Sequence, residues 1–150
     1  EMFPGARFIH IVRHPYKIIP SSINMWDIVS KENSLKGGWK RPTFDETAEV
    51  VNKFWCSVSD NRKKLEKNQF TEVKYEDIEV NPVKELKRIY EELNLEFTDE
   101  FETRITQFME MNGNYKKNVF TLSSEEKCII NKRLGNYSKT FGYDIQEQVG

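Results

Sequence analysis

Arg13 and Ser21 are the two residues of this 150-residue sequence whose types and spacing best suit the binding of a phosphate group. Arg13 directly follows an apolar run at residues 8–12, and Ser21 comes eight positions after Arg13. A guanidinium group offers a planar fork of five N–H donors, and a serine hydroxyl beside helix amides adds to such a site. The pair therefore predicts a phosphate-binding site. The alternative is that Arg13 pairs with an acidic residue and Ser21 only caps a helix.

Two strands are predicted to carry the polar side chains of such a site. Residues 6–12 are apolar on both faces apart from His10, which is typical of a central parallel strand covered by helices. Residues 70–75 form a second short strand that ends at Tyr75. In an open α/β sheet, ligands bind at the carboxyl edge of the strands, and Arg13 and Tyr75 would both lie there.

Helical patterns occupy most of the remaining sequence. Pro15 suits the first turn of a helix that continues to Trp26, while Pro20 predicts a kink or a restart that Ser21 or Ser22 would cap. Loops without periodicity follow at residues 31–42 and 112–118. Four further helices are predicted: from Phe44 towards Leu65 after a capping box of Thr43 with Glu46, from Pro82 to Leu93, from Thr98 or Asp99 to Met109, and from a capping box of Ser123 with Glu126 to Phe141.

This pattern predicts an α/β fold that the chain builds only in part. Two strands are too few for the multi-stranded parallel sheet that a central apolar strand requires. We therefore expect the missing strands upstream of Glu1, and the start at Glu1-Met2 points the same way.

Composition excludes several classes of protein. Hydrophobic residues make up 37% of the chain and aromatic residues 13%, enough for the core of one domain. The net charge of -1 provides no general attraction for nucleic acid or an anionic membrane, and no apolar run is long enough to span a bilayer. No secretion signal is visible. Cys56 and Cys128 lack metal-ligand spacing with the histidines, so we expect no metal site and two free thiols in the core, with a disulfide as the alternative.

Three segments of the chain resemble sulfotransferases that use 3′-phosphoadenosine 5′-phosphosulfate, PAPS. The family's 3′-phosphate-binding segment is a hydrophobic strand, Arg, any residue and Pro, with Ser eight positions after the Arg, and each of these positions is matched here. The family's next motif is a strand ending in Tyr-Glu-Asp-Leu before a helix that begins with proline. The matching segments are residues 7–15 with Ser21, residues 73–82, and, more loosely, residues 113–117, 122–126 and 141–144, which are similar to the closing region of bacterial-type members.

The resemblance implies a P-loop NTPase-like three-layer fold, of which residues 1–150 would be the carboxyl-terminal part of a single sulfotransferase domain. Arg13 and Ser21 would bind the 3′-phosphate of PAPS, and Tyr75 would lie near the adenosine. Lys116 and Lys117 stand where the family supplies late basic contacts to the nucleotide, although the usual Trp-Arg character is absent. The alternative for Tyr75 is that it is only a half-buried strand residue. The alternative for Lys116 and Lys117 is that they lie on a solvated surface without a ligand.

The implied reaction is transfer of a sulfuryl group from PAPS to a hydroxyl or amine of a small-molecule or carbohydrate acceptor. The sequence contains no Gly-rich loop with a following lysine, and in the family both that loop and the catalytic base lie upstream. We therefore assign no catalytic residue and expect the chain alone to be inactive. A non-catalytic nucleotide-binding module and an ATP-preferring P-loop kinase relative are the alternatives. The expected compartment is the cytoplasm, or the Golgi lumen if an amino-terminal anchor exists.

Overall fold

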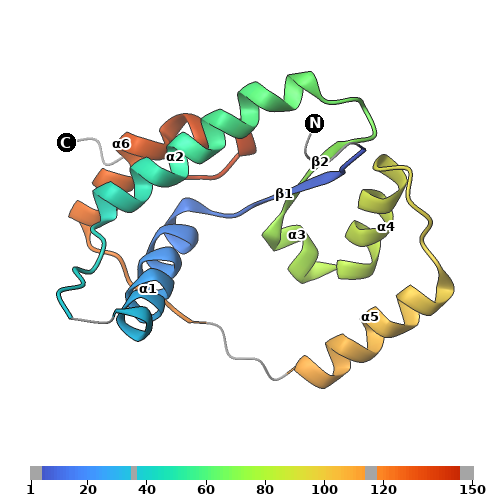
Figure 1. Ribbon diagram of the computed structural model, residues 1–150, viewed down its shortest axis with the longest axis horizontal. Helices are drawn as coiled ribbons and strands as arrows, with labels where there is room; N and C mark the ends of the chain where they lie inside the picture. Colours follow the sequence, from blue (N-terminus) through green and yellow to red (C-terminus); the bar gives the residue numbers. More distant parts are fainter. Residues whose placement is uncertain (1–4, 35–36, 114–117, 146–150) are drawn as a thin grey trace. The chain divides into compact units, whose positions relative to one another are not determined.

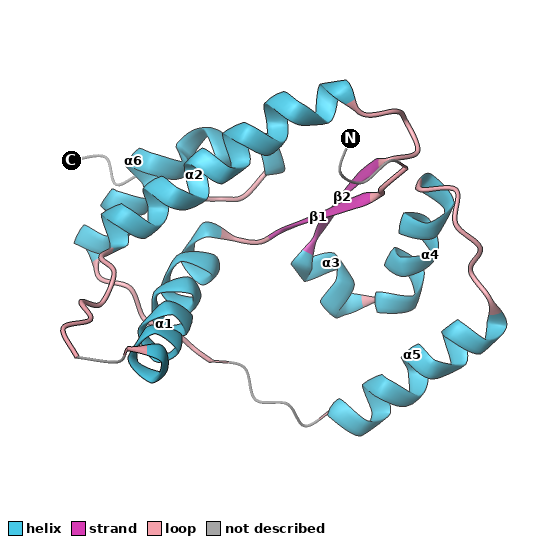
Figure 2. Cartoon of the chain, in the orientation of Figure 1, coloured by secondary structure: helices cyan, strands magenta, loops and turns pink. Residues whose placement is uncertain are grey.

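The computed structural model of the chain describes residues 5–34, 37–113 and 118–145. Helices predominate, and the two strands form a small parallel sheet, so the predicted α/β class is confirmed (Figures 1 and 2). The elements in chain order are β1 (Phe8–Val12), α1 (Pro15–Asn33), α2 (Phe44–Asn61), the 3₁₀ turn η1 (Arg62–Lys64), β2 (Phe70–Lys74), α3 (Tyr75–Val80), α4 (Pro82–Glu92), α5 (Asp99–Asn112) and α6 (Ser124–Phe141).

The chain forms two compact units. The first comprises residues 1–13 and 61–117 and holds both strands with α3, α4 and α5. The second comprises residues 14–60 and 118–150 and holds α1, α2 and α6. The boundary between them falls directly after Arg13, so Arg13 and Ser21 belong to different units.

The sheet of the first unit pairs β1 with β2 in parallel. Ile11 is opposite Val73, and the last pair is Val12 with Lys74. His10, the one polar residue of β1, is opposite Glu72, and its Nδ1 lies 3.0 Å from a carboxylate oxygen of that residue. Arg62 donates a hydrogen bond to the other oxygen of Glu72 at 2.5 Å. The polar position in the strand is therefore explained by its hydrogen bond to Glu72, which also pairs with Arg62.

The core of the first unit lies against β2. Val73 packs with Ile89 and Leu93, and the partly buried side chains of Ile78, Leu86 and Tyr90 surround them. Burial of this kind is the main favourable contribution to folding. The helices after β2 therefore cover one side of the sheet.

Strand β1 is less covered than its sequence predicts. Phe8, Ile9 and Ile11 are 47%, 47% and 53% exposed, whereas Val12 is buried. Within the described ranges β1 pairs only with β2, and the core cluster forms around Val73 of β2. The expectation of a strand buried on both faces is therefore wrong for this chain.

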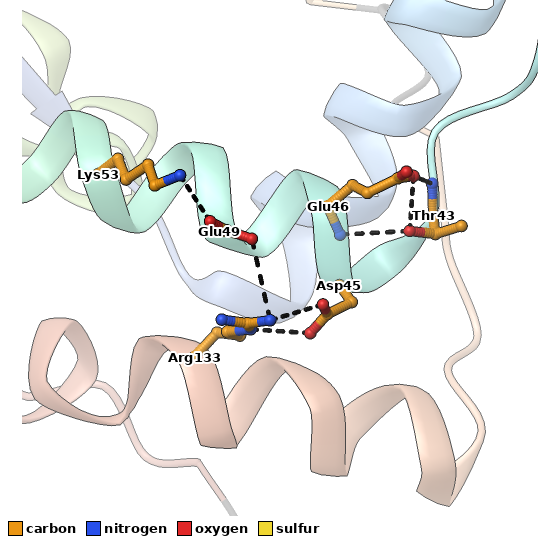
Figure 3. Close-up of polar contacts among 6 residues, drawn as sticks. All are labelled: Thr43, Asp45, Glu46, Glu49, Lys53 and Arg133. Carbon is orange, nitrogen blue, oxygen red and sulfur yellow. Dashed lines mark hydrogen bonds and ion pairs between the residues drawn. The ribbon is translucent and has the colours of Figure 1, made fainter.

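In the second unit, the buried side chains come from all three helices. Tyr16 of α1 donates a hydrogen bond to Asn131 of α6 at 2.8 Å, and Trp55 of α2 meets the ring of Tyr137 of α6 edge-on. Arg133 of α6 binds Asp45 of α2 through two hydrogen bonds (Figure 3). The buried apolar residues of this unit include Ile19, Ile23, Ala48, Ile130 and Leu134.

Both predicted capping boxes are confirmed. The Glu46 amide donates to the Thr43 hydroxyl at 3.2 Å, and the Glu46 carboxylate accepts from the Thr43 amide at 2.9 Å (Figure 3). Ser123 and Glu126 make the same reciprocal pair before α6. Each pair satisfies backbone donors that a helix start otherwise leaves without an acceptor.

The predicted restart of the first helix is wrong. Helix α1 runs unbroken through Pro20, and its cap is His14, whose Nδ1 accepts a hydrogen bond from the Tyr16 amide at 3.2 Å. Pro20 removes one backbone donor at a cost of about 3 kcal/mol in a typical helix interior. Its ring is buried, as is the neighbouring Ile19, so packing within the unit outweighs the local preference.

Three smaller expectations also change. The strand at residues 70–75 stops at Lys74, and Tyr75 begins the short helix α3, which no sequence pattern indicated. Cys56 and Cys128 are free, as predicted, but both are exposed and neither is a core residue. Helix α2 ends at Asn61, before the 3₁₀ turn, rather than near Leu65.

Among the described helices, none is both long and apolar enough to cross a membrane.

Candidate phosphate-binding site

The register of the sheet brings Arg13 and Tyr75 to the same edge. Val12 and Lys74 are the last paired residues of β1 and β2, and each is followed by one of the two side chains. Because the strands are parallel, both residues lie at the carboxyl edge, about 4.8 Å being the usual separation of neighbouring strands. The sequence placed Arg13 after one strand and Tyr75 at the end of the other, and the register makes them neighbours.

The guanidinium group of Arg13 lies over the ring of Tyr75. The distance from the Arg13 Cζ atom to the ring centroid is 4.3 Å, within the range of about 6 Å for a cation–π contact. Both side chains are half-buried, and the Nε atom of Arg13 is buried. The guanidinium group, with its five N–H donors, therefore lies over one face of the Tyr75 ring.

Tyr75 is held on both sides along the chain. Lys74, the residue before it, has the extended conformation of a helix cap, and α3 begins at Tyr75. Helix α3 packs against β2 and α4. The backbone that carries the ring is thus fixed by the sheet on one side and by a packed helix on the other.

Ser21 lies inside α1, half-buried, and does not cap the helix. The alternative that Ser21 only caps a helix is therefore wrong, since His14 takes that position. A serine inside a helix has its backbone groups in the helix ladder, so its hydroxyl is the group that remains to interact with a ligand or a neighbouring side chain. Lys116 and Lys117, the other predicted contacts to the nucleotide, lie outside the described residues.

His14 has a structural role that the sequence did not indicate. Its Nδ1 accepts from the Tyr16 amide, and its Nε2 lies 3.2 Å from the backbone oxygen of Asp144. The ring also packs against the rings of Tyr16 and Tyr143. The residue before a proline at a helix start is the position of the cap, and histidine is uncommon there, which is why the role was missed.

The donor set suits a phosphate group better than a metal ion. Arg13 supplies a permanently charged, planar fork, and Ser21 supplies a hydroxyl, which are donors that phosphate oxygens accept. In the part of the chain that the structure describes, no group of three or more histidine, cysteine and acidic side chains is arranged to hold a metal ion. The Arg13 side chain at the sheet edge therefore fits a phosphorylated ligand.

The fold is therefore of the mixed α/β class, with an arginine at the sheet edge where ligands bind in open α/β proteins. Comparison with known proteins narrows the class. A model described as "Sulfotransferase family" matches residues 1–99, about two thirds of the chain. The chain belongs to the sulfotransferase family, as its motifs predicted.

Two curated mycobacterial relatives support the same assignment. Both are named omega-hydroxy-beta-dihydromenaquinone-9 sulfotransferase Stf3, one from Mycobacterium bovis (strain ATCC BAA-935 / AF2122/97) and one from Mycobacterium tuberculosis (strain CDC 1551 / Oshkosh). Each is 31% identical to the chain over 148 residues, which cover 96% of this chain. The aligned part is 37% of the relatives' own length, so the chain spans little more than a third of these proteins.

Proposed function

We propose that the chain is the carboxyl-terminal part of a PAPS-dependent sulfotransferase domain with a P-loop NTPase-like three-layer fold, and that it supplies the 3′-phosphate and adenosine side of the cofactor site. The observation that carries this proposal is Arg13 at the carboxyl edge of the parallel sheet, supported on the Tyr75 ring. The family match and the mycobacterial relatives support it.

The roles of the individual residues follow from their chemistry. Arg13 binds the 3′-phosphate through its guanidinium fork, and the Ser21 hydroxyl donates to the same phosphate. Tyr75 lies on the adenosine side, and Lys116 and Lys117 add positive charge near the nucleotide. When bound, PAPS supplies the activated sulfuryl group that is transferred to an acceptor oxygen or nitrogen.

The acceptor is proposed to be a small molecule with a hydroxyl group. The relatives' name describes a hydroxylated, lipid-like quinone as the molecule on which those proteins act.

Sulfuryl transfer also needs a base for the acceptor proton and donors for the leaving phosphate. The sequence has no Gly-rich loop with a following lysine, so we propose that the chain alone binds the nucleotide without transferring sulfate.

The test is a calorimetric titration of the chain with 3′-phosphoadenosine 5′-phosphate, with adenosine 5′-phosphate and with ATP. The first two ligands differ only in the 3′-phosphate, so their affinity ratio measures its recognition. Arg13→Ala should lower affinity for the 3′-phosphorylated ligand by about 10- to 100-fold, the range for a lost hydrogen bond to a charged group. Arg7→Ala, which removes an exposed arginine just before the same strand, should have no effect.

Three results would contradict the proposal. Equal binding of the two adenosine phosphates would exclude 3′-phosphate recognition. Preference for ATP would favour the kinase alternative. Transfer of labelled sulfate from PAPS by the chain alone, at an ordinary enzymatic rate of about 1–1000 per second, would show that the transferring groups are present in this sequence.

A further inference from the structure

We propose that Tyr75 acts as a positioning residue for Arg13, so that its contribution to nucleotide binding depends on the 3′-phosphate rather than on the adenosine. The inference rests on the proposed function and deepens it. It starts from the guanidinium group of Arg13, which lies 4.3 Å from the centroid of the Tyr75 ring. One face of the ring is thereby covered by a cation.

The contact is set by the backbone of the first unit. Arg13 and Tyr75 follow the last register pair of the sheet, Val12 with Lys74. Tyr75 is also the first residue of α3, which packs on β2 and α4. Neither backbone is free to move far, because each is joined to the paired strands and the ring side is held by a packed helix. The strand pairing and the packed helix therefore fix the backbone positions from which the two side chains meet.

Such a support matters because arginine is flexible. A guanidinium group on a long side chain samples many rotamers, and binding a phosphate in the two-point geometry of an arginine fork requires one of them. If the ring already holds the Arg13 side chain in place, less conformational entropy is lost when the phosphate binds. The affinity is higher for this reason. The Tyr75 ring favours those Arg13 rotamers that place the guanidinium group over the ring.

The same geometry limits what Tyr75 does for the base. A ring face covered by the Arg13 guanidinium group is not available to stack on adenine. Any direct contact with adenosine is then confined to the hydroxyl, the ring edge or the opposite face. A positioning role and a base-contact role thus predict different dependence on the ligand's 3′-phosphate.

The experiment compares Tyr75→Phe and Tyr75→Leu in titrations with 3′-phosphoadenosine 5′-phosphate and adenosine 5′-phosphate. Tyr75→Phe keeps the ring and is the matched control for the hydroxyl. Tyr75→Leu should weaken binding of the 3′-phosphorylated ligand by about two- to fivefold, the range for a lost cation–π contact at a partly exposed site, and leave adenosine 5′-phosphate unchanged. In an Arg13→Ala background, the Tyr75→Leu effect should vanish.

A spectroscopic measurement tests the contact without any ligand. The ring current of Tyr75 should shift the NMR resonances of the Arg13 side-chain protons, and the shift should persist in Tyr75→Phe. If Tyr75→Leu fails to fold, the wild-type and Tyr75→Phe spectra still decide whether the stack exists in solution. An unshifted Arg13 side chain would overturn the inference.

The titration outcomes separate this inference from the proposed function. If wild-type chain does not discriminate between the two adenosine phosphates, the proposed function fails and the inference fails with it. If discrimination is present and lost in Arg13→Ala, but Tyr75→Leu weakens both ligands equally, Tyr75 contacts the adenosine directly and only the positioning role is overturned. An unchanged affinity in a folded Tyr75→Leu variant would also overturn it.

Discussion

Arg133 of α6 donates two hydrogen bonds to Asp45 of α2, one from Nε to Oδ1 at 2.8 Å and one from Nη2 to Oδ2 at 2.6 Å (Figure 3). This two-point geometry joins two helices through residues that are 88 positions apart in sequence. The same guanidinium group lies 3.9 Å from Glu49, one turn further along α2. The contact therefore orients α6 on α2 through a fixed pair of bonds.

This pair should make the stability of the second unit depend on pH. The hydrogen bonds that Arg133 donates to Asp45 hold the pKa of Asp45 below its ordinary value. A carboxyl group whose pKa is lowered by folding adds stability above its unfolded pKa, about 3.9, and loses it as pH falls through the folded value. We expect Asp45→Asn to lower the urea midpoint at pH 7 by a small amount, and the difference to shrink at pH 3.

The control for that measurement is Asp60→Asn, an exposed aspartate on the same helix. Its urea midpoint should follow the wild-type value more closely at pH 7. A deficit in Asp45→Asn that is equally large at pH 3 and pH 7 would show that the loss comes from packing or capping and not from the ionised carboxylate.

Ser21→Ala tests ligand binding separately from folding. Because Ser21 lies inside α1 and alanine is the best helix former, the substitution should change the free energy of unfolding by less than about 0.5 kcal/mol. Binding of 3′-phosphoadenosine 5′-phosphate should weaken about tenfold, through loss of a hydrogen bond to a charged group. Circular dichroism and calorimetry measure the two effects.

Ser22→Ala is the matched control, since neighbouring helix positions point about 100° apart around the axis. It should leave both measurements near the wild-type values. Equal loss of affinity in both variants would argue against a specific role for the Ser21 hydroxyl. Marked unfolding of Ser21→Ala would point to a structural role instead.

Ile89→Ala should destabilise the first unit strongly. Ile89 is 1% exposed and packs with Val73 and Leu93 at the centre of the core cluster. Removing this side chain should cost about 2–5 kcal/mol in the free energy of unfolding, because a cavity adds to the lost burial. Urea unfolding followed by circular dichroism measures the change.

Val80→Ala provides the comparison for this core substitution, since Val80 is 86% exposed. We expect a change within about 0.5 kcal/mol for this exposed position. Similar losses for the two variants would mean that the cluster around Val73 does not dominate the stability of the unit.

Local sequence signals predicted the elements that local interactions decide. The capping boxes of Thr43 with Glu46 and of Ser123 with Glu126 involve residues three positions apart, so their hydrogen bonds need no tertiary partner. Pro82 at the start of α4 is equally local. The motif around Arg13 identified the family because the strand, Arg13, Pro15 and Ser21 all lie within one short segment of the chain.

Tertiary structure decided what depends on residues far apart in sequence. The unbroken helix through Pro20 and the exposure of Cys56 and Cys128 reflect packing that no local window contains. The neighbouring positions of Arg13 and Tyr75 arise from the register of two parallel strands, 62 residues apart. The sequence by itself determined that Arg13 follows one strand and that Tyr75 lies at the end of another. Only strand pairing, through backbone hydrogen bonds between distant segments, placed the guanidinium group on the ring.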